Sequence, residues 1–310
     1  MLGFLIDKTG VEYTLPSLLS WDIFHSVGDE CDSFEVSVVY SAELLDHLAS
    51  AVRFSANEGS EQVFYGVVDE YRVSISENGC IATVYGRSLK ALLLDNESVD
   101  REYTSLELSD LIEEFVTPLG ITLIERGTVP QLTEFSVKMG ESVWSVLKRF
   151  CLSSAGIRPR FTASGVLLLT GEEGRTVSVN ADTAAFEILH SRKRRGILSK
   201  VYVKNQVTHA TYTVNNQSFI DAGGCCSKAV GVPQITTSVG ARRTGEYMIS
   251  ESYYGKNFAV ISVPELFKCR PADKIRLTGI VLGITGLFPV VSTRCRADAD
   301  GAGTEITIEL

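Results

Sequence analysis

The sequence predicts an α+β fold dominated by β-structure, in which two β-barrel domains flank a small α/β domain. Three observations support this prediction. Alternating apolar and polar residues, the pattern of half-buried strands, prevail in residues 1–98 and again in 189–310. Helical spacing is concentrated between them, in 99–188. The two outer regions also contain similar hairpin patterns, and 310 residues are enough for three domains.

Residues 1–98 are expected to consist mainly of strands. A half-buried strand over 33–40 is indicated by apolar residues at every second position: Phe34, Val36, Val38 and Tyr40. Further strands are expected over 51–55, 61–73 and 80–86. Asn78-Gly79 lies between the last two and predicts a tight hairpin turn, because such a turn needs positive φ angles.

One helix interrupts these strands, over about 41–51. Its expected apolar face consists of three leucines: Leu44, Leu45 and Leu48. Ser41 is the expected N-cap, since a serine oxygen at that position can accept a hydrogen bond from a free backbone amide.

Residues 99–188 are expected to form the α/β domain. Thr104-Ser-Leu-Glu107 has the pattern of a capping box, which predicts a helix to about Val116. The apolar face of this helix comprises Leu108, Leu111, Ile112 and Phe115. Pro118 and Gly120 end the helix, and a short strand is expected over 121–124.

A second helix is expected over 141–154. Apolar residues recur there at helical spacing: Val143, Trp144, Leu147, Phe150 and Cys151. This pattern favours Trp144 as a core residue over a ligand-binding role. Gly156 ends the helix, and a hairpin over 158–170 is expected to turn at Ser164-Gly165.

Residues 189–310 return to strand patterns. Strands are expected over 258–263, 274–278 and 304–310. A helix is expected over 238–252, with the small residues Ala241 and Gly245 on its packing side.

The two β regions contain an internal similarity. Phe64-Tyr-Gly-Val-Val-Asp69 can be aligned with Phe288-Pro-Val-Val-Ser292, and a turn and a closing strand follow each of them. The identity is low, so chance similarity between two hairpins is the alternative. A true repeat would mean two related barrels in one chain.

Three segments carry a resemblance to known proteins. They are the hairpin 63–85 leading into Gly86-Arg87-Ser88, the segment Gly140-Glu-Ser-Val-Trp144 with Leu147-Lys148-Arg149 and Gly156, and the turn Arg270-Pro-Ala-Asp273 with the strand to Leu277. In this order they resemble the baseplate hub family of contractile phage tails, which also occurs in defective prophages and tailocin-type particles. Ala272 departs from the family pattern, because such barrels have a Pro-Gly-Asp turn.

The resemblance implies a fold and an assembly. It implies two tail-tube-like β-barrel domains, at 1–98 and 189–310, around an α/β middle domain at 99–188 that is joined by about 211–250. It also implies a homotrimer whose six barrels form a pseudo-hexameric ring between the sixfold tail tube and the threefold central spike. The implied partners are the tail tube protein, the central spike protein, the baseplate wedge and LysM-like adaptor proteins, and a tape measure protein. Assembly would take place in the host cytoplasm before incorporation into the tail.

Composition and charge disfavour several other functions. The formal net charge of −9 and the pI of about 5.1 disfavour specific nucleic-acid binding. No apolar run approaches the roughly 20 residues of a membrane-spanning helix. Asp7 and Lys8 interrupt the apolar start of the chain, so no secretory signal is expected. The seven scattered cysteines are expected to be reduced thiols.

No catalytic, cofactor-binding or metal-binding residues are expected. The four histidines lie near no nucleophile elbow, and no zinc-binding spacing occurs. Cys225-Cys226 is a poor chelating pair, and the glycines at 279, 283 and 286 fit no phosphate-binding loop. The acidic pairs Glu172-Glu173 and Asp298 with Asp300 are expected in solvated turns.

One charge cluster, Arg192-Lys193-Arg194-Arg195, suggests a site. The alternatives are a solvated connection between domains, an interface with acidic surface on a neighbouring hub, tube or spike, and contact with passing DNA. Two functions besides the hub also remain. A hub-like N-terminal part of a siphophage tail-tip protein would share the fold but normally continues into a further region, whereas this chain stops at a strand. A β-rich hydrolase would need a catalytic residue.

Overall fold

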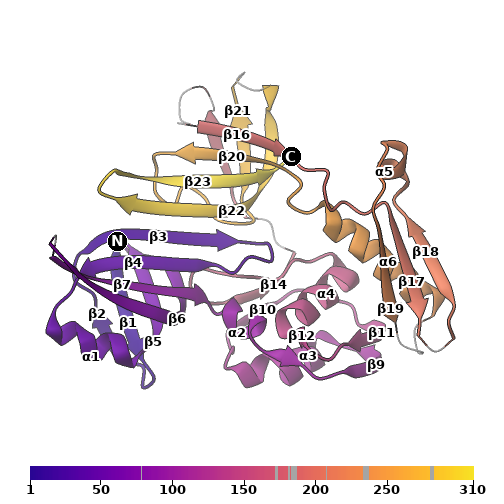
Figure 1. Ribbon diagram of the computed structural model, residues 1–310, viewed down its shortest axis with the longest axis horizontal. Coiled ribbons are helices and arrows are strands. Elements are labelled where there is room, and N and C mark those ends of the chain that lie inside the picture. The colour runs from indigo at the N-terminus through magenta and orange to yellow at the C-terminus, as the bar shows by residue number, and fades with distance from the viewer. Residues whose placement is uncertain are drawn as a thin grey trace.

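The fold is dominated by one large, mostly antiparallel sheet that runs through both β regions (Figure 1). The computed structural model describes residues 1–310 except 78, 172–173, 181, 183–186, 207, 233–236 and 280–282. Within this part of the chain the sheet has 13 strands, in the order β16-β20-β23-β22-β3-β4-β7-β6-β5-β1-β2, with β15 and β21 attached beside β22. The β-dominated fold class is therefore confirmed.

The first β region contains seven strands and one helix. They are β1 Leu2–Asp7, β2 Glu12–Thr14, β3 Leu18–Ser26, β4 Ser33–Val39, α1 Ala42–Ser50, β5 Ala51–Glu58, β6 Glu61–Ser76 and β7 Gly79–Ser88. Three stacked or tilted rings lie at the centre of its core, with the centroids of Phe34 and Phe54 4.0 Å apart and those of Phe34 and Phe64 5.2 Å apart. All the strands expected here are present.

Two details of the first region differ from expectation. Leu44 and Leu48 are buried, but Leu45 is 41% exposed, because a residue one position along a helix is turned about 100° from its neighbour. Ser41 occupies the N-cap position, although its side chain makes no capping hydrogen bond. The hairpin between β6 and β7 is present and Gly79 has a φ of 112°, while Asn78 lies outside the described residues.

The middle region packs short strands and helices around its own core. Its elements are α2 Lys90–Leu94, β8 Glu97–Ser98, β9 Arg101–Leu106, α3 Leu108–Leu111, the π-helical turn Ile112–Val116, the 3-10 turn Thr117–Leu119, β10 Ile124–Arg126, β11 Leu132–Val137, β12 Glu141–Ser142, α4 Val143–Ala155, β13 Arg160–Phe161 and β14 Leu167–Leu169. Trp144 is buried in this core, as expected. The predicted hairpin is formed by β13 and β14.

The start of the first helix in this region was predicted wrongly. Thr104 to Leu106 belong to β9, which pairs with β11, and the capping box is formed by Glu107 and Asp110. Both patterns place an acidic residue three positions after a capping residue, so the sequence alone did not separate them. The short strand β10 also begins three residues later than expected, at Ile124, where it pairs in parallel with β14.

A separate unit follows β16 and contains β17 Lys200–Asn205, β18 Thr211–Asn215, α5 Gln217–Asp221, β19 Ser227–Val232 and α6 Ser238–Tyr253. The predicted helix over 238–252 is confirmed. Gly245 lets α6 approach β18, because a Cβ at this position would lie 2.4 Å from the Val214 side chain. Glu251 of α6 forms ion pairs with Lys148 and Arg158 of the middle region, at 2.5 and 2.7 Å.

The second β region contains β15 Thr176–Asn180, β16 Glu187–Arg192, β20 Asn257–Val263, β21 Lys274–Thr278, β22 Gly286–Asp298 and β23 Gly301–Glu309. Its connection to the first region is a ladder: residues Ser292–Ala297 of β22 pair antiparallel with Trp21–Ser26 of β3. Figure 1 shows β22 lying alongside β3 between the two β regions.

The two β regions repeat the same strand pairing residue by residue. One row of neighbours across four strands of the first region is Trp21, Val36, Val84 and Tyr71. The equivalent row of the second region is Ile188, Ile261, Ile306 and Thr293. Both hairpins close at equivalent pairs, Ser76 with Gly79 and Asp298 with Gly301. Thus β3, β4, β6 and β7 correspond to β16, β20, β22 and β23.

The hairpins also share an irregularity. The β6–β7 register shifts between Val68 and Glu70, and the β22–β23 register shifts between Val290 and Ser292. In the structure Asp69 therefore corresponds to Val291, whereas the sequence alignment ends with Asp69 on Ser292, one residue later. The repeat exists, but the strand pairing does not confirm two separate closed barrels, because β22 and β3 join the regions in one sheet.

The turn before β21 has the conformation that the missing glycine would favour. Ala272 has a φ of 74°, in the left-handed region that is costly for any residue with a Cβ. Asp273 stabilises the turn, because its carboxylate accepts hydrogen bonds from the backbone amides of Arg270 and Arg175 at 2.9 and 3.0 Å.

Among the described residues, no helix is both long and apolar enough to span a membrane.

Candidate assembly interface

The basic run, residues Arg192–Arg195, begins at the last residue of β16 and leads into the inserted unit. Its backbone is fixed at both sides: the Lys193 amide donates to the Lys256 carbonyl, and Ile197 is buried just beyond the run. The four side chains are all exposed. The fold therefore presents these charges at a defined place on the surface.

Two of the four cations lie against aromatic rings. The Nζ atom of Lys193 is 4.9 Å from the ring centroid of Phe258. The guanidinium carbon of Arg194 is 5.8 Å from the ring centroid of Phe219 of α5, and its Nη2 donates to the Ala222 carbonyl at 2.6 Å. Arg194 thus ties the run to the inserted unit while its charge stays at the surface.

The basic run has no acidic partner within the described part of the chain: none of its side chains lies within ion-pairing distance of a carboxylate there. The structure adds a further cation, Lys256, which precedes β20 and approaches the run so closely that a Cβ on Gly196 would lie 3.1 Å from its Nζ. Lys256 was not predicted as part of the site, because nothing in the sequence indicates that it meets a run some sixty residues earlier.

A groove of about 710 Å³ opens beside the run. Its lining includes Arg192–Arg194 together with Phe219, Tyr253 and Leu310. Glu309 also lines it, and burial raises the pKa of its carboxyl above the usual range while Arg158 opposes this rise. The groove thus combines several cations with apolar rings, a composition typical of protein interfaces.

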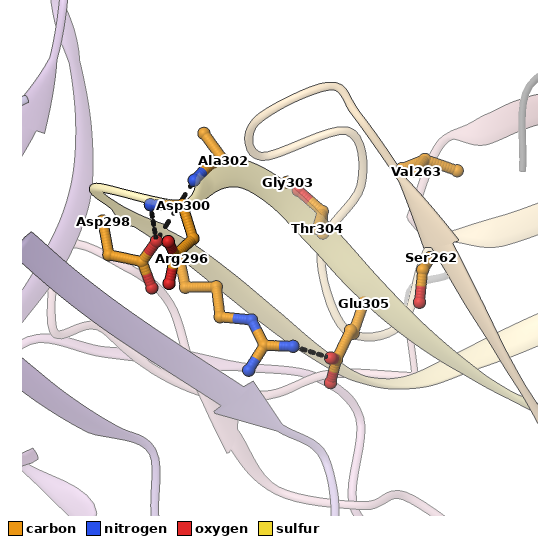
Figure 2. Close-up of a pocket in the computed structure, with 10 residues that line it drawn as sticks. Ser262, Val263, Arg296, Asp298, Asp300, Ala302, Gly303, Thr304 and Glu305 are labelled. Atoms are coloured by element: carbon orange, nitrogen blue, oxygen red, sulfur yellow. Dashed lines mark hydrogen bonds and ion pairs between the residues drawn. The ribbon is translucent and has the colours of Figure 1, made fainter. Parts of the chain in front are cut away.

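An acidic hollow of about 320 Å³ lies at the other end of β23, at the tip of the β22–β23 hairpin (Figure 2). Arg296 reaches across to Glu305, and the Asp298 carboxylate accepts the backbone amides of Asp300 and Gly301 at 2.8 and 3.2 Å. Asp298 and Asp300 therefore lie in an exposed turn, as expected. Glu172 and Glu173 lie outside the described residues.

The arrangement nearest to a catalytic site involves His25. Its Nδ1 lies 3.7 Å from the buried carboxylate of Asp32, and its Nε2 donates to the Val63 carbonyl at 2.9 Å. The Val63 carbonyl accepts the hydrogen bond from Nε2, and no hydroxyl or thiol of the described residues is hydrogen-bonded to Nδ1 as a nucleophile beside a base would be. His47 stacks on Tyr13, with ring centroids 3.8 Å apart.

The cysteines show no paired arrangement that would carry chemistry. All seven are free thiols, and Cys225 is exposed beside the half-buried Cys226. Burial raises the pKa of the Cys269 thiol to about 12, which makes it a poor nucleophile. Within the described residues, no group of three or more potential metal ligands gathers.

Comparisons with known proteins identify the fold. No protein-family model and no curated protein sequence matches this chain. Solved structures match nearly its whole length: a tail protein from Neisseria meningitidis has a TM-score of 0.76 at 15% identity, covering 99% of this chain and 95% of that one. The 43 kDa tail protein of prophage MuSo2 from Shewanella oneidensis has a TM-score of 0.75 at 17% identity, covering 99% and 98%.

A third solved structure extends the likeness to secretion systems. It is an E. coli component of the type VI secretion system, described as structurally similar to the T4 bacteriophage tail proteins gp27 and gp5. Its TM-score is 0.59 at 10% identity, and the match covers 94% of this chain and 73% of that one. At these identities the likeness shows the fold, and the sequence-based resemblance to baseplate hub proteins is confirmed at that level.

Proposed function

We propose that this chain is a structural baseplate hub subunit, three copies of which form a pseudo-hexameric ring between the sixfold tail tube and the threefold central spike. The observation that carries the proposal is the internal repeat. Two β regions with matching strand pairing lie side by side in one sheet, joined by the ladder between β3 and β22. A chain that carries two similar units can offer six similar surfaces from three copies.

The fold comparisons support this function without assigning it. Tail proteins from two bacteria share the fold over nearly the whole chain, and the E. coli relative in fold is described as similar to tail proteins gp27 and gp5. A tail role needs no catalytic residue. We therefore propose a structural role rather than an enzymatic one.

The proposed assembly has defined parts. Two tube-like barrel domains would comprise residues 1–98 and 189–310, and an α/β middle domain would comprise 99–188 with 211–250 against it. The ion pairs of Glu251 with Lys148 and Arg158 support this last contact. The proposed partners are the tube, spike, wedge, LysM-like adaptor and tape measure proteins, first in the host cytoplasm and then in the tail or tail-like particle.

We assign the basic run to the assembly surfaces of this hub. Its four exposed cations and Lys256 lack acidic partners in the described chain, so an acidic surface on a neighbouring subunit would complement them. Binding of passing DNA is less favourable, because clustered cations hold phosphates strongly and a tail channel must let DNA slide.

Native mass tests the hub function directly. Light scattering across a concentration series, without and with the spike protein of the same particle, should detect a species of about 101 kDa, three chains of 33.8 kDa each. Replacing all four residues of the basic run by Glu should reduce this species, whereas the same number of Glu substitutions on the exposed face of α1 should not. A monomer under every condition, spike included, would overturn the hub assignment.

A further inference from the structure

Besides the outer edges of the shorter strands β2 and β15, two strand edges of the large sheet are unpaired within the described part of the chain. The first is the outer edge of β16, which pairs only with β20. The second belongs to the distal half of β6, residues Glu70–Ile75. This half pairs with β7, but β5 covers the other edge of β6 only as far as Val67. Unpaired edges recruit further strands, so proteins normally cover or disrupt them.

The internal repeat shows what covers such edges elsewhere in this molecule. β3 is the equivalent of β16, and the distal half of β22 is the equivalent of the distal half of β6. These two equivalents pair with each other: β3 and the distal half of β22 form the antiparallel ladder that joins the β regions. Each chain thus contains one such ladder, and it also contains the two strand edges, of β16 and of the distal half of β6, that could form a second ladder with other copies.

We propose that β16 of one copy pairs antiparallel with Glu70–Ile75 of β6 in the next copy, in the register that β3 and β22 use within the chain. The inference deepens the proposed hub function and rests on it for the number of copies. In the ladder within the chain, Ser26 lies opposite Ser292. The equivalent residues are Lys193 and Glu70, so the proposed register puts Lys193 opposite Glu70. At the other end, Ile188 lies opposite Ile75 by transfer from Trp21 opposite Ala297.

The inward-facing side chains of the two edges suit each other. Ile75 is 77% exposed in the single chain, although large apolar side chains are rarely left so uncovered. Its counterpart Ile188 already packs partly against the core of the second region. Val73 is likewise packed partly against the core of the first region. Pairing would extend both cores across the junction at Ile188 and Ile75, as the pair from which they are transferred, Trp21 and Ala297, does in the ladder within the chain.

Two of the other pairs join a cation to a carboxylate or an aromatic ring. Lys193 of the basic run would meet Glu70, whose carboxylate already pairs with Arg72 in the chain at 2.7 Å and would then be shared by two cations. Arg192 meets Tyr71, whose ring is 37% exposed and offers a cation–π contact. Leu189, 55% exposed, would lie beside Ser74 on the outer face. The pairing therefore explains why an exposed basic run directly follows an edge strand.

The pairing is head to tail, since the two edges are different surfaces of the chain. Such contacts close into a ring when each step turns by the right angle. Because every junction, within a chain and between chains, would use the same ladder, three chains would give six similar junctions. A backbone ladder also provides hydrogen bonds at every second residue, the mode of β-augmentation.

Disulfide trapping tests the register. We would place cysteines at Ser74 and Leu189, which the proposal puts opposite each other, in a Cys225→Ser background. The matched control combines Ser74→Cys with Ser191→Cys, two residues out of register and too far apart at about 7–8 Å for a disulfide. Under mild oxidation of the assembled protein, the first pair should link chains head to tail, with trimers as the largest product on a non-reducing gel. The control should remain mostly unlinked.

A charge exchange gives a second readout that folding defects do not mimic. Glu70→Lys and Lys193→Glu should each weaken assembly by about two- to fivefold, and the double exchange should restore it. Both side chains are exposed, so neither change disturbs a core. Glu70→Lys also removes the exposed ion pair with Arg72, so restoration by the double exchange is the result that identifies the junction.

The outcomes separate this inference from the hub function. A trimer in which the 74/189 and 74/191 pairs link equally, or not at all, would overturn the strand pairing and leave the hub intact. Specific 74/189 linking into products longer than trimers would support the pairing and overturn the closed ring of three. A chain that stays monomeric with the spike present would overturn both.

Discussion

The two β regions share their strand pairing but differ in what connects the strands. In the first, β3 turns into β4 within six residues, and in the second, the equivalent strands β16 and β20 are separated by the whole inserted unit. The helix α1 leads into β5, whereas an irregular segment with a left-handed Ala272 leads into β21. The strands beside β5 and its equivalent β21 differ in direction as well. In the first region β1 pairs antiparallel with β5, and in the second region β15 pairs parallel with β21.

The comparison indicates which features the sheet requires. Register, hairpin closure and the bulge are matched, because a shift of one residue would move every buried side chain to the opposite face. Connections at strand ends carry no such constraint and can accept an insertion. The inserted unit brings the basic run, Lys256 and the groove to the surface, so the difference between the two regions accounts for the candidate interface.

The largest expected effect comes from equivalent core positions. Phe54 of β5 corresponds to Ile275 of β21, and both are fully buried. Phe54→Ala should lower the free energy of unfolding by about 4 kcal/mol and Ile275→Ala by about 3 kcal/mol, because the aromatic side chain leaves the larger cavity. Urea denaturation measures both. The control is Val52→Ala at a neighbouring exposed position, which should change the free energy of unfolding by less than about 0.5 kcal/mol. A decrease as small as this for Phe54→Ala would contradict the role of the ring cluster.

A smaller effect is expected in the connection before β21. Ala272→Gly should raise the free energy of unfolding by about 1 kcal/mol, because glycine tolerates the φ of 74° without Cβ strain. Thermal unfolding measures the gain. Ala297→Gly, in the extended strand β22, is the matched control and should destabilise by about 0.5–1 kcal/mol. Destabilisation by both changes would rule out strain at this turn.

The smallest effect concerns another equivalent pair, Arg87 and Glu309. Arg87 forms ion pairs with Asp69 and Asp95, while burial raises the pKa of Glu309. A carboxyl whose folded-state pKa is raised costs stability once it ionises, and the cost disappears as pH falls below the unfolded value of about 4.5. Glu309→Gln should therefore raise the melting temperature slightly at pH 7 and not at pH 4. An equal gain at both pH values would exclude ionisation as the cause.

Much of the secondary structure could be predicted because local patterns determined it. The strand at 33–40, the Gly79 hairpin and the helices containing Trp144 and Gly245 all follow from periodicity and turn chemistry. The capping box at Glu107 was missed, because an equally good pattern stands three residues earlier in β9. Leu45 was misassigned, since a run of leucines does not reveal which side of the helix faces the core.

The candidate interface could be predicted only in part. The basic run is visible as four consecutive cations, but its approach to Lys256 and Phe219 depends on how the inserted unit folds back. The free edges of β16 and β6 had no signal in the sequence either. An edge is a property of which strand lies next to which, and pairing partners are far apart along the chain.

The sequence by itself determined the β-dominated class and the helical middle region, because both follow from local periodicity, and its local similarity suggested a repeat without excluding chance. Only the tertiary structure decided that β22 pairs with β3, and that β3, β4, β6 and β7 match β16, β20, β22 and β23 in register on both sides of an inserted unit. The physical reason is that sheet pairing is non-local. Hydrogen bonds and side-chain burial between distant strands select the register, and that selection leaves the two complementary edges uncovered.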